Sequence, residues 1–255
     1  MATSASGEWR ICPEGEHYVK AHALHIPPSK NNPHGKIVTR KAHCAKCTSS
    51  RDTLSYDELQ CIAQSRFSEL EGPPTAKALK KFDNADEFDM HIRGWTQYWN
   101  SVFNSSEPLD PNLVKALIAS ESSFRVVLRT PTKNPKLGDA CGLMQLTNST
   151  IRILRNHRGE IKEHFIAVSD DEIFDPSANI CAGIRWLFRK KVTAAARLKH
   201  SATWDDTIAE YKGILKGIIE NKNPDPLGEM KIFRGYYQQL TGGAVEKVCV
   251  SEPVF

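Results

Sequence analysis

The amino-acid sequence predicts a mainly α-helical protein that carries a small, partly irregular segment rich in cysteine and histidine at its N-terminus. From Ser55 onward, apolar residues recur at the three- and four-residue spacings of a helix face. Several of these stretches open with a capping residue and a proline, as helices do. Residues 9–51 instead combine turn-forming Pro and Asn with five histidines, and with eight basic residues against two acids.

The overall composition describes a globular chain with a mild positive charge. It has 255 residues, of which 40% are apolar and 25% charged, and its formal net charge is +4. This charge suits an anionic polymer but does not by itself predict nucleic-acid binding. There is no run of eighteen apolar residues, so no membrane span is expected. The opening MATSASGEWR shows no signal peptide, so we expect a cytoplasmic protein, one exported by another system, or a trimmed sequence.

The first expected helix follows Ser55, which with Glu58 fits a capping box. Its apolar stripe consists of Leu59, Ile62, Ala63 and Phe67. The breaker sequence LEGPPT at 70–75 then suggests a boundary between an N-terminal segment, 1–72, and a main domain, 73–255.

Three further helices are expected in the main domain. The segment 110–124 begins with Asp110 as its cap and Pro111 at the first helical position. The segment 175–192 has Ser177 as a candidate cap, and 204–219 aligns an apolar set on one face. That set is Ile208, Tyr211, Leu215 and Ile218. Residues 130–142 form a long irregular exception, and such loops are often functional.

Glu121 lies on the apolar face of its predicted helix. It shares that face with Ile118, Leu117, Val114 and Leu113, which precede it by three, four, seven and eight residues respectively. A carboxyl group placed near a core favours its neutral form, as a general acid requires. The alternative is that Glu121, in the last turn, reaches water or Arg125.

The stretch DACGLMQLT places one glutamine, Gln145, inside an apolar run that follows a glycine. A buried amide needs both donor and acceptor partners, which makes it an unusual residue for a plain core. Gln145 is therefore expected either to line a cleft or to hold the loop backbone, and both roles are compatible.

Four motifs in order resemble those of soluble lytic transglycosylases and, more loosely, of goose-type lysozymes. They are Glu-Ser-x-Phe at 121–124, Gly-Leu-Met-Gln at 142–145, Asn-Ile-x-x-Gly at 179–183, and Tyr211 in Glu-Tyr-Lys-Gly. The resemblance covers about residues 76–220 and implies a lysozyme-like helical domain over 76–245. At the last motif this sequence departs from the family, because Lys212 stands where the family has Asn and the glycine comes one residue early.

The resemblance also implies the site and its chemistry. Glu121 would be the catalytic residue, and the substrate-binding residues would be Ser122, Gly142, Met144, Gln145, Asn179 and Tyr211. Glu121 would protonate the oxygen between N-acetylmuramic acid and N-acetylglucosamine, and would then accept the proton of the muramic 6-hydroxyl as it closes a 1,6-anhydro ring. No water, metal or cofactor is required.

Asp139 is a candidate second carboxylate, which would turn the outcome from transglycosylation to hydrolysis by a lysozyme. Its alternative role is that of a turn residue after Gly138. A non-catalytic cell-wall-binding protein with the same fold is the remaining alternative, although such a protein has no need of an acid at the position of Glu121.

The cysteines and histidines of residues 9–51 leave three alternatives open. Cys44 and Cys47 have zinc-knuckle spacing, and Cys12 and His43 could complete four zinc ligands. A Cys12–Cys44 disulfide and free thiols are the other two. Seven cysteines in total exclude complete intramolecular pairing. The basic charge of this segment would suit an anionic cell-wall polymer or a delivery partner.

A wall-cleaving domain with a small basic segment resembles type VI secretion effectors and phage muralytic enzymes. We therefore expect peptidoglycan as the partner, action in the bacterial periplasm or cell wall, and a cognate immunity protein or delivery component. The rival from another class is a zinc-dependent nucleic-acid-binding protein built on residues 9–51, which would bind DNA with strong salt dependence. Nucleic acid is not the partner that we expect.

Overall fold

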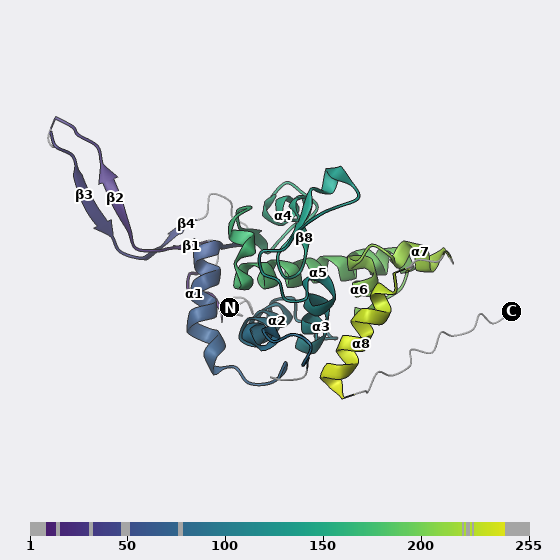
Figure 1. Cartoon of the computed structure of the whole chain (residues 1–255). Coiled ribbons are helices and arrows are strands. Elements are labelled where there is room, and N and C mark those ends of the chain that lie inside the picture. Colours follow the sequence, from purple (N-terminus) through teal and green to yellow (C-terminus); the bar gives the residue numbers. More distant parts are fainter. Residues whose placement is uncertain are drawn as a thin grey trace.

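The computed structural model describes residues 9–13, 16–30, 33–46, 52–75, 79–220, 222, 225 and 227–242. It confirms the predicted mainly α-helical class (Figure 1). The α-helices are α1 (Tyr56–Arg66), α2 (Asp89–Phe103), α3 (Pro111–Ser122), α4 (Asn148–Arg155), α5 (Pro176–Leu198), α6 (Trp204–Tyr211), α7 (Leu215–Ile219) and α8 (Glu229–Thr241). Short 3-10 helices are η2 (Phe67–Glu69), η3 (Ala85–Phe88), η4 (Pro135–Leu137) and η5 (Glu172–Phe174).

Short strands complete the fold in four small sheets. They are β1 (Glu16–Val19), β2 (His22–Ile26), β3 (Lys36–Arg40), β4 (His43–Lys46), β5 (Thr53–Ser55), β6 (Arg129–Pro131), β7 (Asp139–Cys141), β8 (Leu146–Thr147) and β9 (Phe165–Ala167). Strand β1 pairs with β4, β2 with β3 and β5 with β9, and β6, β7 and β8 form a three-stranded sheet.

Helix α5 is the central element, and α1, α2, α4 and α6 all pack against it. Its cap is Asp175, whose carboxylate accepts from the amide of Ala178 at 2.9 Å, so the prediction of Ser177 as the cap is wrong. The hydroxyl of Ser177 instead accepts from the indole of Trp95 at 2.9 Å. A buried Trp N–H needs an acceptor, and this contact supplies one from the neighbouring helix.

Helix α1 belongs to the same hydrophobic core as the rest of the described chain. Its predicted stripe, Leu59 to Phe67, is buried in that core, and β5, just before it, pairs in parallel with β9. The core therefore runs across the expected boundary at 72/73. Ser55 caps the helix as predicted, but Glu58 does not return the bond, because its carboxylate pairs with buried Arg10 at 2.6 Å.

Strands β1 to β4 form an antiparallel hairpin that projects from the helical body, seen in purple at the left of Figure 1. We call residues 16–46 the arm. The stretch KIVTRKAHC forms β3 and the start of β4. A disulfide joins Cys12 to Cys44 beside the body. Arg10, two residues before Cys12, bonds the carbonyl of Glu16 at 3.0 Å, so the base of the arm is fastened to the core.

Two further expectations are corrected. The segment 130–142 is mostly the hairpin of β6 and β7, with η4 at its turn, and is not irregular throughout. The helix predicted over 204–219 breaks after Tyr211, because Gly213 adopts a positive φ of 76°. In the part of the chain that the structure describes, no helix combines the length and apolarity that a membrane crossing demands.

Candidate active site

Glu121 lies in the last turn of α3, a helix whose residues from Leu113 to Ala119 are all buried. Ser123 and Phe124 then both adopt left-handed backbone conformations, which end the helix. The reversal sends Phe124 into the core, where its ring stacks on Phe88 at a centroid distance of 6.0 Å. The final residue of the Glu-Ser-x-Phe motif is thus an anchor that fixes the end of the helix bearing Glu121.

The carboxylate of Glu121 forms an ion pair with the ammonium of Lys212. The Lys212 side chain is only 3% exposed and that of Glu121 is 18% exposed, so the pair lies at the edge of the interior. The alternative contact with Arg125 is wrong, since that guanidinium bonds the carbonyl of Ser122 at 3.1 Å. The departure from the family at position 212 therefore places a cation on the candidate catalytic acid.

The turn at 142–145 is held by Asn179 from inside α5. The side-chain oxygen of Asn179 accepts from the amide of Met144 at 2.8 Å. Its side-chain NH₂ donates to the carbonyls of Cys141 at 3.1 Å and Ile173 at 2.9 Å. Gly142 has a φ of 73°, and a Cβ there would lie 2.2 Å from the side-chain nitrogen, Nδ2, of Asn179. These two motifs are thus complementary parts of one packing arrangement.

Met144 makes the second close contact between the turn and α5. A Cβ on Gly183 would lie 2.2 Å from the sulfur of Met144, so only a glycine admits this side chain. The residues predicted to bind substrate at Met144 and Asn179 are both buried. In the structure they shape the turn from behind, and whether they also contact substrate stays a prediction.

Tyr211 lies beneath the same turn and close to the carboxyl of Glu121. Its hydroxyl donates to the carbonyl of Met144 at 2.6 Å. Burial raises the pKa of the Tyr211 phenol well above its ordinary value, and the negative charge of Glu121 raises it further. The phenol therefore stays protonated and keeps donating, which joins α6 to the turn.

Gln145 has both of the roles that its sequence position suggested. With a φ of 48°, it lies in a left-handed conformation, and its side-chain NH₂ donates to the carbonyl of Gly142 at 2.8 Å. It also lines a cleft of about 450 Å³ together with Tyr211 and Lys212. Of the three residues predicted to line one groove, Gln145 and Tyr211 line this cleft, whereas Glu121 is not among its lining residues and is joined to it through the ion pair with Lys212.

Three other polar residues have more local partners. The hydroxyl of Ser122 is buried and donates to the carbonyl of Ile118 at 3.2 Å, within its own helix. Asp139, the candidate second carboxylate, is half-buried in β7 and pairs with Arg129 at 3.6 Å. Glu210 is buried against Arg197 at 2.9 Å and Lys190 at 3.5 Å.

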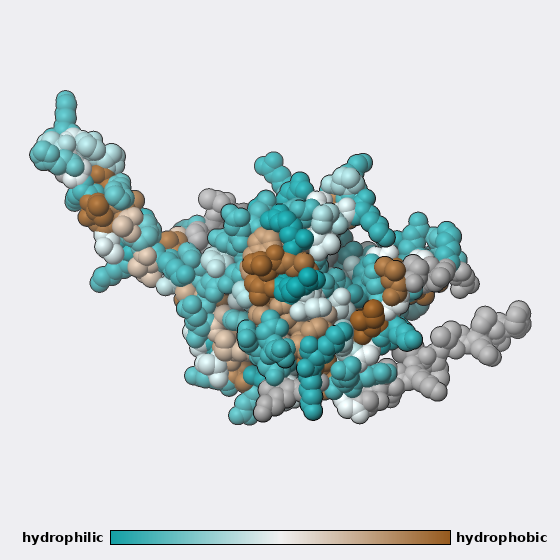
Figure 2. All heavy atoms as spheres, viewed as in Figure 1, coloured by the Kyte–Doolittle hydropathy of each residue, from teal (hydrophilic) through white to brown (hydrophobic). Residues whose placement is uncertain are grey.

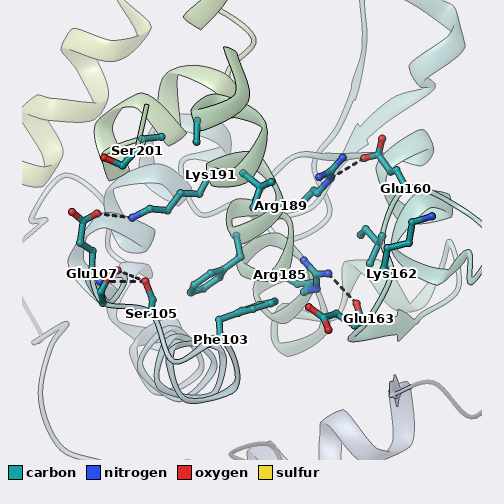
Figure 3. A pocket seen from close by; sticks show the side chains of 16 residues that line it. Phe103, Ser105, Glu107, Glu160, Lys162, Glu163, Arg185, Arg189, Lys191 and Ser201 are labelled. Atoms are coloured by element: carbon teal, nitrogen blue, oxygen red, sulfur yellow. Dashed lines mark hydrogen bonds and ion pairs between the residues drawn. The ribbon is translucent and has the colours of Figure 1, made fainter. Parts of the chain in front are cut away.

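A larger cavity, of about 610 Å³, opens on another part of α5, between it and the segments at 103–107 and 160–163 (Figure 3). None of the motif residues lines it. Its charged groups largely satisfy one another, as Lys191 does with Glu107 at 2.8 Å and Arg189 with Glu160 at 3.5 Å. The cleft beside Gln145 is therefore the better candidate for the active site.

Of the alternatives for the cysteines, the structure has the Cys12–Cys44 disulfide. The two sulfurs are thus occupied, and Cys47, the third sulfur considered for zinc, lies outside the described residues. Among the residues that are described, no cluster of three or more His, Cys, Asp or Glu could hold a metal ion. Cys141 and Cys181 are free and buried, and burial raises the pKa of both thiols.

The fold and this geometry define a helical domain in which Glu121 pairs with Lys212, a residue that lines the cleft. Residues 101–203 match the family model described as the transglycosylase SLT domain. The predicted resemblance is thereby confirmed over this segment, which is similar to the SLT transglycosylase domain. The matched segment includes Glu121, the turn at 142–145 and Asn179, whereas Tyr211 and Lys212 follow its end.

The search of curated protein sequences found no match. Among solved structures, the chain is similar to the 70 kDa soluble lytic transglycosylase SLT70 from Escherichia coli, with 16% sequence identity and a TM-score of 0.39. The similarity covers 73% of this chain and 33% of SLT70, so the chain matches about a third of the length of that protein.

Removing the Tyr211 hydroxyl is expected to loosen the turn. Tyr211→Phe leaves the carbonyl of Met144 without this donor, which should cost about 1–2 kcal/mol of folding free energy. We expect glycan cleavage to fall more than that loss explains, because the turn carries Gln145. Denaturant unfolding and cleavage would be measured for this variant and for Tyr237→Phe. The control removes a hydroxyl of α8 that donates to the carboxylate of Asp110, the cap of α3. An equal loss of activity in both variants would contradict this positioning role.

Proposed function

We propose that the protein cleaves the glycan strand of peptidoglycan as a lytic transglycosylase, with Glu121 as the catalytic residue. The observation that carries the proposal is the position of Glu121 at the end of α3, inside the segment that matches the SLT domain model and paired with Lys212 of the cleft. The bond cut is that between N-acetylmuramic acid and N-acetylglucosamine. No metal or cofactor is needed for this chemistry.

The reaction uses one proton twice. Glu121 protonates the glycosidic oxygen as the bond to the muramic anomeric carbon breaks, and the N-acetylglucosamine end leaves with a hydroxyl group. The muramic 6-hydroxyl then attacks the same carbon and returns its proton to the carboxylate. The atoms balance without water, and the product has a 1,6-anhydro ring. General acid–base catalysis of this kind needs a proton within hydrogen-bond reach of the leaving oxygen.

Lys212 gives this site a feature that the family motif lacks. In the resting pair, the ammonium and the carboxylate share one donated proton. For the first step, Glu121 must hold a proton. Either Lys212 passes one to the carboxylate, or Lys212 moves away as the glycan binds and Glu121 takes up a proton from solvent. In both cases the pair keeps Glu121 oriented towards α6 until substrate arrives.

Hydrolysis is the alternative outcome, and it needs a second carboxylate to activate water. Asp139 is the candidate from the sequence, but it faces Arg129 across the β6–β7 hairpin. Glu210 lines the cleft but pairs with two cations, which leaves it poorly suited to act as a base. These pairings favour transglycosylation over hydrolysis.

The products decide between the two outcomes. Under transglycosylation, mass spectrometry of digested sacculi should show muropeptides lighter than the hydrolytic ones by one water molecule. Asp139→Asn should keep most of the activity, because the ion pair with Arg129 is partly exposed and weak. Asp171→Asn, an exposed acid before η5, is a matched control. Hydrated reducing ends together with an inactive Asp139→Asn variant would establish a lysozyme instead.

The remaining expectations concern the cell. Action on the cell wall agrees with the matched domain. Delivery by a secretion system or a phage, and a cognate immunity protein, stay predictions. Failure of the purified protein to release any muropeptide between about pH 5 and 8, where glycosidase carboxyls operate, would favour the non-catalytic wall binder.

A further inference from the structure

The positive charge of the chain is concentrated in the arm, residues 16–46. The arm holds six of the 34 basic residues and one of the 30 acids, Glu16, so its formal charge is +5. The other 224 residues hold 28 basic and 29 acidic residues, a net charge of −1. An even distribution of charge would serve solubility, whereas segregation onto one projection creates a local positive potential.

Nearly all of this charge is available to a partner. The six basic residues are exposed: Lys20, Lys30, Lys36, Arg40, Lys41 and Lys46. Among the described residues only Lys20 makes an ion pair, with Asp57 of α1 at 3.4 Å. On the face that Figure 2 shows, at its upper left, the arm has a hydrophilic tip and an apolar patch about midway along its length.

The arm holds its charges in a fixed pattern. Lys36 and Arg40 are four residues apart in β3 and therefore share one face, on either side of Val38. Opposite them in β2 stand Ile26 and His22. A two-stranded hairpin is marginal by itself, and here the Cys12–Cys44 disulfide and buried Arg10 fasten its base to the core.

We propose that the arm binds the insoluble peptidoglycan sacculus through the carboxylates of its stem peptides and holds the cleft on the polymer. This inference rests on the proposed function, because the same polymer is the substrate. A sacculus presents many carboxylates on a net-like surface, and a row of unpaired cations on a projecting arm complements them. Each contact is weak, but several together hold the enzyme near its substrate.

The arm is less well suited to other polyanions. A membrane-binding segment needs an apolar face to insert, and Ile37 is the only strongly exposed large apolar side chain of the described arm residues. Single-stranded nucleic acid needs aromatic stacking platforms, and the arm has one aromatic residue, Tyr18. Duplex DNA favours an extended basic surface, whereas the rest of this chain is slightly acidic.

The test is a binding assay that does not depend on cleavage. Purified sacculi are mixed on ice with the full chain, and the pelleted fraction is measured over a range of salt concentrations. The arm variant carries Lys30→Gln, Lys36→Gln, Arg40→Gln and Lys41→Gln. The control removes four exposed, unpaired cations from the body: Arg66→Gln, Lys80→Gln, Lys199→Gln and Lys231→Gln. We expect the arm variant to bind about tenfold more weakly and the control to change by less than about twofold.

Sacculi with amidated carboxylates should lose the same binding, and added salt should abolish the difference between wild type and arm variant. Equal pelleting of the arm variant and the wild type would overturn the proposal. So would tighter binding of the wild type to duplex DNA, or to vesicles of anionic phospholipid, than to sacculi.

Cleavage separates this inference from the proposed function. The arm variant should lose activity on sacculi but keep it on soluble glycan fragments. A wild type that releases no product from either substrate, yet pellets through its arm, would refute the transglycosylase and leave the arm inference intact. Loss of activity on soluble fragments in a folded arm variant would show that the arm forms part of the catalytic site, and would overturn its role as a tether.

Discussion

Glu121→Gln is expected to reduce peptidoglycan cleavage by about 10³–10⁴-fold or more, the largest functional effect that we predict. Glutamine retains the shape and the acceptor oxygen of the side chain but has no proton to give to the leaving oxygen. One residue performs both the acid and the base step in the proposed mechanism, so a single substitution disables both. Muropeptide release from sacculi, measured over a range of enzyme concentrations, would quantify the loss. Wild-type rates in this variant would overturn the assignment of Glu121.

The same substitution should also weaken the fold, because Lys212 loses its counter-ion. The sequence alone suggests that removing a near-core charge is harmless, but Lys212 is 3% exposed and its ammonium would remain without a carboxylate. Removing one partner of a buried pair is costly. Since Glu121 is 18% exposed and glutamine can still accept a hydrogen bond, we expect a loss of about 1–2 kcal/mol.

A double-mutant cycle separates this effect from catalysis. Glu121→Gln with Lys212→Gln should recover most of the lost stability, because the two amides can bond each other and no charge remains buried. It should not recover activity. Recovery of cleavage in the double variant would mean that Glu121 serves the ion pair and does not supply the proton.

Local signals in the sequence predicted the elements that depend on local contacts. Asp110 and Pro111 open α3 as expected, since a cap and its helix are neighbours in the chain. The capping oxygen of Ser55 is likewise correct. Glu58 and Ser177 were assigned wrongly because their partners, Arg10 and Trp95, are 48 and 82 residues away. Such long-range partners leave no periodic trace in the sequence.

In the candidate site, too, local motifs are predicted from the sequence and long-range partners are not. The motif order predicts Glu121 as the catalytic residue, and Glu121 lies within the segment 101–203 that matches the family model. Its role stays a prediction. The sequence does not predict the cations around the cleft. It shows Lys212 only as a departure from the family motif, and nothing in it places Lys190 and Arg197 there. An apolar stripe indicates which face of a helix is buried, but it does not indicate which charged side chain of another helix contacts that face. The clue that existed was Glu210 beside Tyr211, an acid on a helix that packs against the basic stretch of α5.

Asn179→Ala should cause the largest loss of stability among these variants. It removes the acceptor for Met144 and the two donors to Cys141 and Ile173, all in a buried environment. An unsatisfied buried group costs about 1–3 kcal/mol, and a water molecule that enters the vacated volume would offset part of this. We therefore expect about 3–5 kcal/mol overall in denaturant unfolding. Ile180→Val, the next residue on α5 and also buried, should cost only about 1 kcal/mol.

Asn179→Asp shows why both halves of the amide matter for the turn that carries Gln145. The carboxylate can still accept from Met144, but it turns acceptor atoms towards the carbonyls of Cys141 and Ile173, where like partial charges repel. Stability should therefore stay well below wild type, and cleavage should fall even under conditions where the variant is folded, because the turn is displaced. If Asn179→Asp has the unfolding free energy and the cleavage rate of the wild type, the two donated bonds contribute little. The turn is then held by Met144 against Gly183 and by the hydroxyl of Tyr211.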